Sequence, residues 1–200
     1  MTDGGTTPTT LDLEPQARIV ARLAANVTQE QLQGATPCPQ YAVHHLLGHL
    51  AGLTVAFRDA GRKDLGATTD TNPGAALPDL GPGWREALPT ELDGLAEAWR
   101  DPAAWTGMTR AGGIDLPGEI AGAVAVDELV VHGWDLARAT GQEYEPDEAA
   151  LRATHDFLAA AATEMRGSDG PFGAVVSVPD DAPLLDRVIG LSGRDPGWKP

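Results

Sequence analysis

The sequence predicts an all-α protein built as a helix bundle. Five segments place apolar residues at the three- and four-residue spacing of amphipathic helices. The stretches between them are long and rich in Gly, Pro, Asp and Thr, without the alternation of apolar and polar residues that marks a strand. Only residues 175–178 suit a short extended piece, and no other segment is an obvious partner for them. Helices without a sheet must bury their apolar stripes against one another, which produces a bundle.

The first predicted helix follows a polar tail. Residues 1–10 are small and polar, so we expect a flexible tail there, and a chain of 200 residues suits one domain over residues 11–200. Helical spacing begins near Leu11 or Glu14, where several alanines raise the helix propensity. Residues 28–31 suit a cap and a short further turn, which a glycine and a proline then end.

Two helices and two irregular connectors are expected in the middle of the chain. The second helix covers about residues 41–61, after a loop that contains two prolines. Residues 62–83 predict a long connector without strands. The third helix covers about residues 84–100, where Pro89 either starts the regular helix or kinks it. Residues 103–116 are expected to form a second irregular connector.

Three further helices complete the prediction. The fourth helix covers residues 117–140, with a proline in its first turn and a glycine after its end. The fifth begins after Tyr144 and ends near Arg166, with acidic residues in its first turn that complement the helix dipole. A short sixth helix is expected over residues 182–191, capped by one of the aspartates at 180–181. These last residues form the short C-terminal segment of the domain.

Charge and composition exclude several classes of partner. The chain has 14 Lys and Arg against 29 Asp and Glu, a formal net charge of −15. Nucleic acids and anionic membranes need a basic face, so we expect neither as a partner.

The single cysteine, Cys38, fits a reducing compartment. The longest apolar run, Ala121–Val126, is too short to span a bilayer, and no secretion signal is recognisable, so we expect a cytoplasmic protein. The oligomeric state stays open.

Three polar residues on the predicted inward faces are candidate metal ligands. Glu128 and His132 lie four residues apart in the fourth helix, on one face and among apolar residues. A buried carboxylate and imidazole are costly unless something pairs with them. His49 lies in the second helix within LLGHLAG, and leucines flank it on its own face. Two imidazoles and one carboxylate suit Zn²⁺, Fe²⁺ or Ni²⁺, with positions left for water or substrate.

Other interpretations of the same residues stay open. His49 is also typical of a hydrogen-bonded core histidine, and Glu128 with His132 is also typical of a pair that stabilises a helix. His45 and His49 form a competing pair at the same spacing, which suits zinc. His44 and His45 are adjacent, however, so one of them must face outward near the start of the helix. We interpret both as residues of the surface or rim.

Three more residues have two interpretations each. Asp135 lies about one turn beyond His132 and either orients an imidazole from outside the ligand set or is a surface acid. Cys38 stands at the start of the second helix, where a thiol can have a lowered pKa, or it simply fills a loop. His155 is expected to be exposed or to form a hydrogen bond on its helix face.

Three stretches of the chain resemble an actinobacterial family of metal-binding proteins: TPCPQYAVHHLLGHLAG, LPGEIAGAVAVDELVVHGWDLARATG and GPFGAVVSVPDDAPLLDRVIGLSGRDPGW. That family is related to the N-terminal domain of mycothiol-dependent maleylpyruvate isomerase, in the DinB-like superfamily. The resemblance extends from about residue 12 to the last residue, and GHLAG together with ELVVHGWDLA is its most specific part. It implies a DinB-like four-helix bundle with a divalent metal, most readily Zn²⁺, held by His49, Glu128 and His132.

The resemblance also implies a function. A metal with open positions can activate a thiol, so the expected activity is that of a thiol-dependent transferase or isomerase. The expected partners are a low-molecular-weight thiol such as mycothiol and a small electrophilic substrate. One alternative is a non-catalytic metal-binding or stress-related module. A second alternative is a metal-dependent hydrolase, for which Asp135 is the only nearby candidate for a general base. No catalytic residue beyond the ligand set is predicted.

Overall fold

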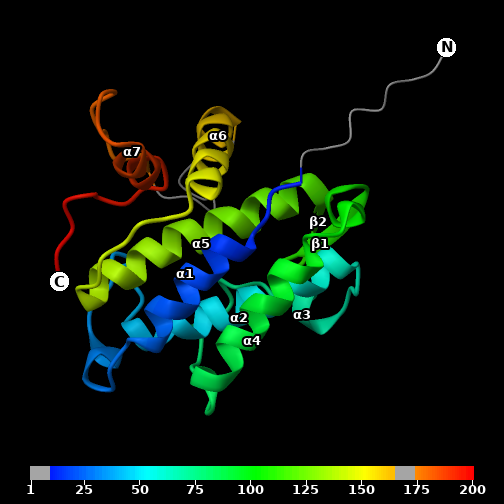
Figure 1. The fold of residues 1–200 in the computed structure, drawn as a ribbon, viewed down its shortest axis with the longest axis horizontal. Helices are drawn as coiled ribbons and strands as arrows, with labels where there is room; N and C mark the ends of the chain where they lie inside the picture. The colour runs from blue at the N-terminus through cyan, green and yellow to red at the C-terminus, as the bar shows by residue number, and fades with distance from the viewer. Residues whose placement is uncertain (1–9, 165–173) are drawn as a thin grey trace.

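The computed structural model describes residues 10–164 and 174–200 (Figure 1). The predicted tail and the predicted end of the fifth helix near Arg166 lie almost entirely outside these residues. In chain order the elements are α1 (Glu14–Ala25), η1 (Glu30–Gln33), α2 (Val43–Arg62), α3 (Ala67–Asp70), α4 (Trp84–Ala98), η2 (Pro102–Trp105), β1 (Met108–Ala111), β2 (Ile114–Pro117), α5 (Gly118–Thr140), α6 (Glu148–Glu164) and α7 (Leu184–Leu191).

Four long helices form the bundle. α2 packs against α4 and α5, and α1 packs against the same two helices. Figure 1 shows α6 and α7 on the other side of α5, where α6 contacts both α5 and α7. α5 is therefore covered on two sides, and 16 of its 23 residues are buried. A helix that is apolar almost all round belongs at the centre of a fold, as the run of Ala, Val and Leu in α5 indicates.

Two tryptophans hold the first half of α5 in place. The indole nitrogen of Trp99 donates to the Phe57 carbonyl at 2.9 Å, and that of Trp105 donates to the Trp99 carbonyl at 2.8 Å. Both rings pack over Gly122, where a Cβ atom would lie 2.5 Å from Trp105 and 2.8 Å from Trp99. Glycine is therefore required for this close approach. Because Trp99 also bonds to Phe57 of α2, this contact fixes the position of α5 along the axis of α2.

The connector predicted to be irregular contains a hairpin. β1 and β2 pair antiparallel, with Thr109 opposite Leu116, so the prediction for residues 103–116 is wrong. The turn uses Gly112 and Gly113 at φ +61° and +79°, the left-handed values that a two-residue hairpin turn demands. The Thr109 hydroxyl donates to the Ala60 carbonyl at 2.6 Å. Strands of four residues are too short for a period-two pattern, so tertiary contacts decide this hairpin.

Other predicted boundaries need smaller corrections. Pro117 is the residue before the first turn of α5 rather than a member of it. The residue before α7 is Pro183, whose side chain makes no capping hydrogen bond, so neither aspartate at 180–181 is the cap. The connector 62–83 contains the short helix α3 and crosses α2 at Gly48, where a Cβ atom would lie 2.7 Å from the Asp79 carbonyl oxygen. No helix within the described ranges is long and apolar enough to cross a membrane.

Candidate metal centre

α2 and α5 bring the three predicted ligands together. The Nε2 atoms of His49 and His132 lie 3.3 Å and 3.0 Å from the same oxygen, Glu128 Oε2. One ligand atom from each residue lies within 4.8 Å of those of the other two. The side chains are 11%, 26% and 10% exposed for His49, Glu128 and His132, so the group is largely shielded from solvent and Glu128 is its most exposed member. The predicted inward orientation of all three residues is confirmed.

The local sequence explains why these side chains point inward. His49 lies between Leu46 and Leu50, which are fully buried, so the apolar stripe of α2 carries the imidazole into the bundle. Leu129 on α5 is equally buried, and the four-residue spacing of Glu128 and His132 places both side chains on one face. The two imidazole rings meet edge to face, with centroids 4.8 Å apart.

A second carboxylate lies behind His132. Nδ1 of His132 donates to Asp135 Oδ2 at 2.8 Å, and Asp135 is fully buried. Because Nδ1 is engaged in this bond, Nε2 is the ring nitrogen that faces Glu128 Oε2 at 3.0 Å. A carboxylate that orients a ligating histidine in this way is a recurrent feature of metal sites. Of the two interpretations of Asp135, the structure supports the orienting residue and not the surface acid.

The electrostatics of the cluster keep its carboxylates ionised. Burial alone would raise the pKa of Glu128, but hydrogen bonds to His132 and His49 lower it well below its usual range. Burial would lower the pKa of His132, yet hydrogen bonds to Asp135, Cys38 and Glu128 raise it well above its ordinary value. The pKa of Asp135 is lowered because the Arg194 guanidinium and His132 outweigh the effect of burial. The carboxylates are thus anionic, and the His132 imidazole and the Arg194 guanidinium place positive charge beside them.

Cys38 belongs to a neighbouring group of polar atoms. Cys38, His132 and Asp135 also offer ligand atoms within 4.8 Å of one another. Nη2 of Arg194, however, lies 3.3 Å from the Cys38 sulfur and 3.1 Å from Asp135 Oδ2. A guanidinium in this position repels a metal ion. The cation of this second group is therefore the arginine, and the thiol donates to Asp135 Oδ2 at 3.3 Å.

The other histidines make structural contacts. His45 Nδ1 accepts from the Ala42 N–H at 3.1 Å at the start of α2, and His44 Nδ1 donates to the Leu32 carbonyl at 2.9 Å. Neither belongs to a group of candidate metal ligands in the described part of the chain. His155 Nε2 accepts from Arg187 at 2.9 Å and so links α6 to α7. The alternative ligand pair of His45 with His49 therefore does not form.

Three residues near the cluster were not predicted from the sequence. The Tyr41 ring is half-buried beside His49, with centroids 5.7 Å apart, and burial raises the pKa of Tyr41. Asp127 is buried next to Glu128, its Oδ1 atom has no hydrogen-bond partner among the described residues, and burial raises its pKa to about 8. Arg194 follows α7 and contacts Asp135. The apolar residues around Asp127 in the sequence could have identified it as a buried acid, whereas nothing in the local sequence marks Arg194.

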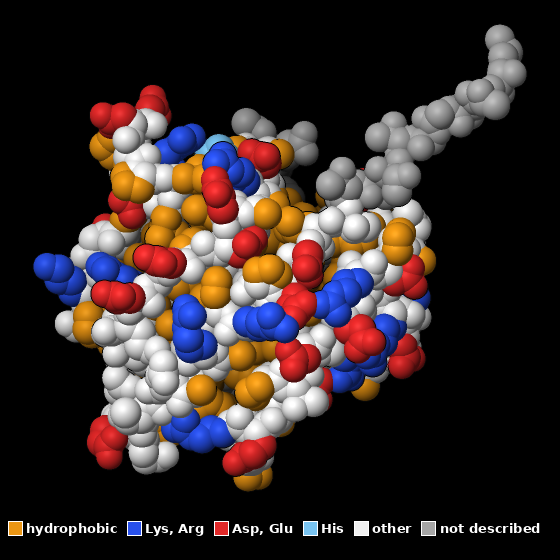
Figure 2. All heavy atoms as spheres, in the orientation of Figure 1, with side chains coloured by type: hydrophobic (Ala, Val, Ile, Leu, Met, Phe, Trp, Pro, Cys, Tyr) orange, Lys and Arg blue, Asp and Glu red, His pale blue; other side chains and the backbone are white. Residues whose placement is uncertain are grey.

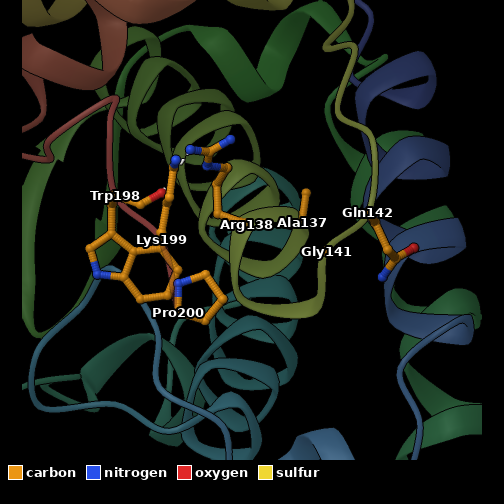
Figure 3. A pocket seen from close by; sticks show the side chains of 7 residues that line it. All are labelled: Ala137, Arg138, Gly141, Gln142, Trp198, Lys199 and Pro200. Carbon is orange, nitrogen blue, oxygen red and sulfur yellow. Dashed lines mark hydrogen bonds between the residues drawn. The ribbon is translucent and has the colours of Figure 1, made fainter.

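A separate hollow lies at the carboxyl end of α5 (Figure 3). It has a volume of about 270 Å³, and its lining includes Arg138, Gln142 and Trp198. The Arg138 guanidinium donates to the Trp198 carbonyl at 2.7 Å. The half-buried Arg138 guanidinium is therefore engaged in holding the last residues, and the hollow shares no residue with the proposed metal-ligand cluster. Figure 2 shows acidic and basic side chains interspersed over one face, without a continuous basic patch there.

Comparisons with known proteins identify relatives of this chain. The family model described as "Mycothiol maleylpyruvate isomerase N-terminal domain" matches residues 13–137. Two Mycobacterium tuberculosis proteins, Uncharacterized protein MT0763 of strain CDC 1551 and Uncharacterized protein Rv0738 of strain H37Rv, are 27% identical over 179 residues, which cover 87% of this chain and 91% of each relative. The matched residues include His49, Glu128, His132 and Asp135, whereas Arg194 lies beyond them.

Solved structures support the fold. The crystal structure of the mycothiol-dependent maleylpyruvate isomerase superposes with a TM-score of 0.50 at 18% identity, over 76% of this chain and 69% of that chain. A histidine-to-alanine mutant of the same enzyme gives a TM-score of 0.50 at 17% identity over the same shares. The predicted all-α, DinB-like four-helix bundle with long connectors and a short C-terminal extension is confirmed.

Proposed function

Because this chain belongs to the family of mycothiol maleylpyruvate isomerase N-terminal domains, we propose that it is a metal-dependent enzyme that uses a low-molecular-weight thiol. The thiol is of the mycothiol type, and the second substrate is a small electrophile that is isomerised or that accepts the thiol. The metal is a divalent ion, with Zn²⁺ the first candidate and Ni²⁺ or Fe²⁺ compatible with the same ligands.

One observation carries the proposal: two imidazole nitrogens from different helices converge on one carboxylate oxygen. His49 and His132 both direct Nε2 at Glu128 Oε2, at 3.3 Å and 3.0 Å. A shared acceptor holds both rings with their ligating atoms facing one point. Two histidines and one glutamate form a donor set found in catalytic zinc sites, where three protein ligands leave a position for substrate. The residues present therefore fit a divalent metal.

The roles of the chain's own residues follow from their contacts. His49, Glu128 and His132 would hold the ion, and a thiol bound to it would have a lowered pKa and react as a thiolate. Asp135 keeps the proton of His132 on Nδ1, which leaves Nε2 as the ligating atom. Tyr41 stands beside His49 with its ring half-buried, so it borders the side from which small molecules approach.

The hydrolase alternative loses support from the position of Asp135. A general base must reach the proton that it accepts. Asp135 is fully buried, and its oxygens accept from His132, Cys38 and Arg194. It is thus committed to groups of the protein. The remaining alternative, a metal-binding module without turnover, shares the same ligands and differs only in activity.

Elemental analysis combined with an activity screen tests the proposal. The purified protein is expected to contain about one divalent metal ion per chain. It should convert small electrophiles such as maleylpyruvate only when both metal and mycothiol are present. His49→Ala should lose metal and activity together, whereas the matched variant His155→Ala, on the far side of α5, should keep both. Thiol-dependent turnover in metal-free protein, or coordination by other residues, would contradict the proposal. Stoichiometric metal without any thiol-dependent turnover would favour the non-catalytic module.

A further inference from the structure

The segment after α7 returns to the metal-ligand cluster and places a guanidinium against its outer carboxylate. Arg194 Nη2 donates to Asp135 Oδ2 at 3.1 Å, and Nε lies 3.3 Å from Oδ1. Nη1 donates to the Ser192 carbonyl at 3.0 Å, which fixes the guanidinium relative to its own backbone. Arg194 and Asp135 are 59 residues apart in the sequence, so only the folded chain brings them together.

A buried carboxylate needs a partner of this kind. Asp135 is fully buried, and an unpaired charge in such a place is strongly unfavourable. A planar guanidinium can contact both oxygens of a carboxylate and thereby set its rotation, which a lysine cannot do. Asp135 Oδ2 is also the oxygen that accepts from His132 Nδ1. The rotation of the carboxylate therefore determines where the imidazole ring lies.

Cys38 completes the surroundings of the same guanidinium. Its sulfur lies 3.3 Å from Arg194 Nη2 and 3.3 Å from Asp135 Oδ2. Three segments distant in the sequence thus meet at one point: the loop before α2, the middle of α5 and the residues after α7. Within the described residues, neither Arg194 nor Cys38 belongs to the group formed by the three proposed metal ligands. Arg194 is linked to that group through its contact with Asp135, which in turn bonds to His132.

We propose that Arg194 is a positioning residue of the metal centre, which orients Asp135 so that His132 presents Nε2 to the ion. The inference rests on the proposed metal site and extends it beyond the family match, because Arg194 lies outside the matched residues. The C-terminal segment is thereby a part of the site and not merely a cover for α5.

Arg138 provides a matched control. It lies on α5 and donates to the carbonyls of Trp198 at 2.7 Å and Pro196 at 3.4 Å, so it anchors the same C-terminal segment (Figure 3). Within the described residues, its hydrogen bonds go to these two carbonyls and not to Asp135. Arg138→Gln therefore loosens the attachment of the segment while it leaves the contact of Arg194 with Asp135 in place. Comparing variants of the two arginines therefore separates the orientation of Asp135 from the general docking of the C-terminal segment.

Zinc affinity is measured by competition with a chromogenic chelator for the wild type, Arg194→Gln, Arg194→Lys and Arg138→Gln. Arg194→Gln should bind zinc about 10- to 100-fold more weakly, the effect typical of losing an outer hydrogen-bond partner. Arg194→Lys should show a smaller loss, because an ammonium supplies charge without the two-point contact. Arg138→Gln should stay within about threefold of the wild type. In NMR spectra of the metal-free protein, the His132 Nδ1 proton should exchange faster in Arg194→Gln than in Arg138→Gln.

Each result decides the inference. Wild-type zinc affinity in Arg194→Gln overturns it, and so does an equal loss in Arg138→Gln, which would mean that only docking of the segment matters. If Arg194→Gln does not fold, the affinity of Arg194→Lys relative to Arg138→Gln decides in the same way. A wild-type protein that binds no zinc, nickel or iron overturns the proposed metal site and this inference together. Normal zinc binding in the wild type with no effect at Arg194 overturns this inference alone.

Discussion

Two buried polar clusters lie against α5, and they differ in how their hydrogen bonds are completed. In the first, the Gln16–Tyr144 network, Gln16 Nε2 donates to the Leu129 carbonyl at 3.1 Å and to the Tyr144 hydroxyl at 2.9 Å. Gln16 Oε1 accepts from the Asp147 N–H at 3.0 Å, and the Tyr144 hydroxyl donates to the Val130 carbonyl at 2.6 Å. Every side-chain partner is neutral.

The second cluster, formed by the metal ligands and Asp135, is charged and shares its acceptors. Two imidazoles approach a single oxygen of Glu128, and Asp135 Oδ2 accepts from three different side chains. A neutral network with matched donors and acceptors holds helices together and has no use for a further partner. An anionic cluster with crowded acceptors is stabilised further when a cation joins it. The comparison supports a structural role for the first cluster, and it makes the second the place where the proposed metal would bind.

The largest expected effect concerns a ligand. Glu128→Gln keeps the size of the side chain and removes the negative charge that both imidazoles face. Zinc affinity should fall by more than about 100-fold, the upper end of the effect of an outer partner. Zinc at about 100 times its Kd should raise the unfolding free energy of the wild type by about 2.7 kcal/mol, and this gain should vanish in the variant. Chemical unfolding with and without zinc measures both quantities. If zinc raised the unfolding free energy of Glu128→Gln as much as that of the wild type, the distinction between the two clusters would be wrong.

The matching change in the first cluster should affect stability alone. Gln16→Leu removes a buried amide, so the Asp147 N–H loses its acceptor and the Tyr144 hydroxyl, which still donates to Val130, loses its donor. The unfolding free energy should therefore fall by about 1–3 kcal/mol. The loss should be the same with chelator and with zinc, and zinc affinity should not change. Urea unfolding in both conditions measures it. Asn26→Ala, which removes an exposed bond to Gln142, should cost less than about 0.5 kcal/mol.

A smaller effect is expected where Tyr144 crosses α5. A Cβ atom at Gly133 would lie 3.0 Å from the Tyr144 hydroxyl oxygen. Gly133→Ala should therefore displace the ring from Val130 and lower stability by about 1 kcal/mol net of the gain in helix propensity. In a Tyr144→Phe background the penalty should shrink, with a coupling of at least about 0.5 kcal/mol in a double-mutant cycle. If the effects of the two substitutions on the unfolding free energy were additive, the Tyr144 hydroxyl would not be the group that clashes with the new methyl group.

The smallest expected effect tests whether charge alone distinguishes the two clusters. Asp59 near the end of α2 is buried and anionic, yet Arg58 Nε at 2.9 Å and the Thr68 hydroxyl at 2.8 Å occupy its oxygens. Burial would raise the pKa of Asp59, but these hydrogen bonds lower it below its ordinary value. A lowered folded-state pKa stabilises the protein above the unfolded-state pKa of about 4, and the contribution is lost as pH falls through the folded-state value.

Asp59→Asn should therefore be less stable than the wild type near neutral pH, and the difference should shrink below about pH 4. Urea unfolding across this range measures the difference, and zinc should not alter it. A difference that grows with acidity would contradict the sign of the pKa shift. Zinc dependence of the Asp59→Asn difference would show that any buried carboxylate in this protein responds to metal.

Much of the helical framework follows from periodicity, and the hairpin shows where periodicity stops being informative. The stripes of α2 and α5 predicted that His49, Glu128 and His132 face inward, because a side chain at helical spacing among buried leucines has one direction available. β1 and β2 are four residues each, too short to show alternation, and the Thr109 hydroxyl bond to Ala60 helps to hold them against α2. The sequence of a long helix shows which of its faces is buried, whereas the formation of a short strand depends on contacts with neighbouring elements.

The candidate site divides in the same way. The inward positions of the proposed ligands could be predicted because each lies on a long helix whose buried face the sequence reveals. Gly133 lies against Tyr144, and no local pattern in the sequence identifies that partner. Arg194 follows a short helix and is surrounded by Ser, Gly and Asp, which is typical of an exposed loop. Its contact with Asp135 spans 59 residues, and no local pattern encodes a contact of that range.

The sequence by itself determined the helix bundle, the central position of α5 and the three inward polar residues, because amphipathic spacing and the cost of burying polar groups act within single helices. Only the tertiary structure decided that the two imidazoles meet one carboxylate oxygen, that Asp135 orients His132 and that Arg194 reaches Asp135 from beyond α7. These contacts depend on how far each helix is shifted along its neighbour, and large side chains such as Trp99 and Trp105, packed over Gly122, set that shift.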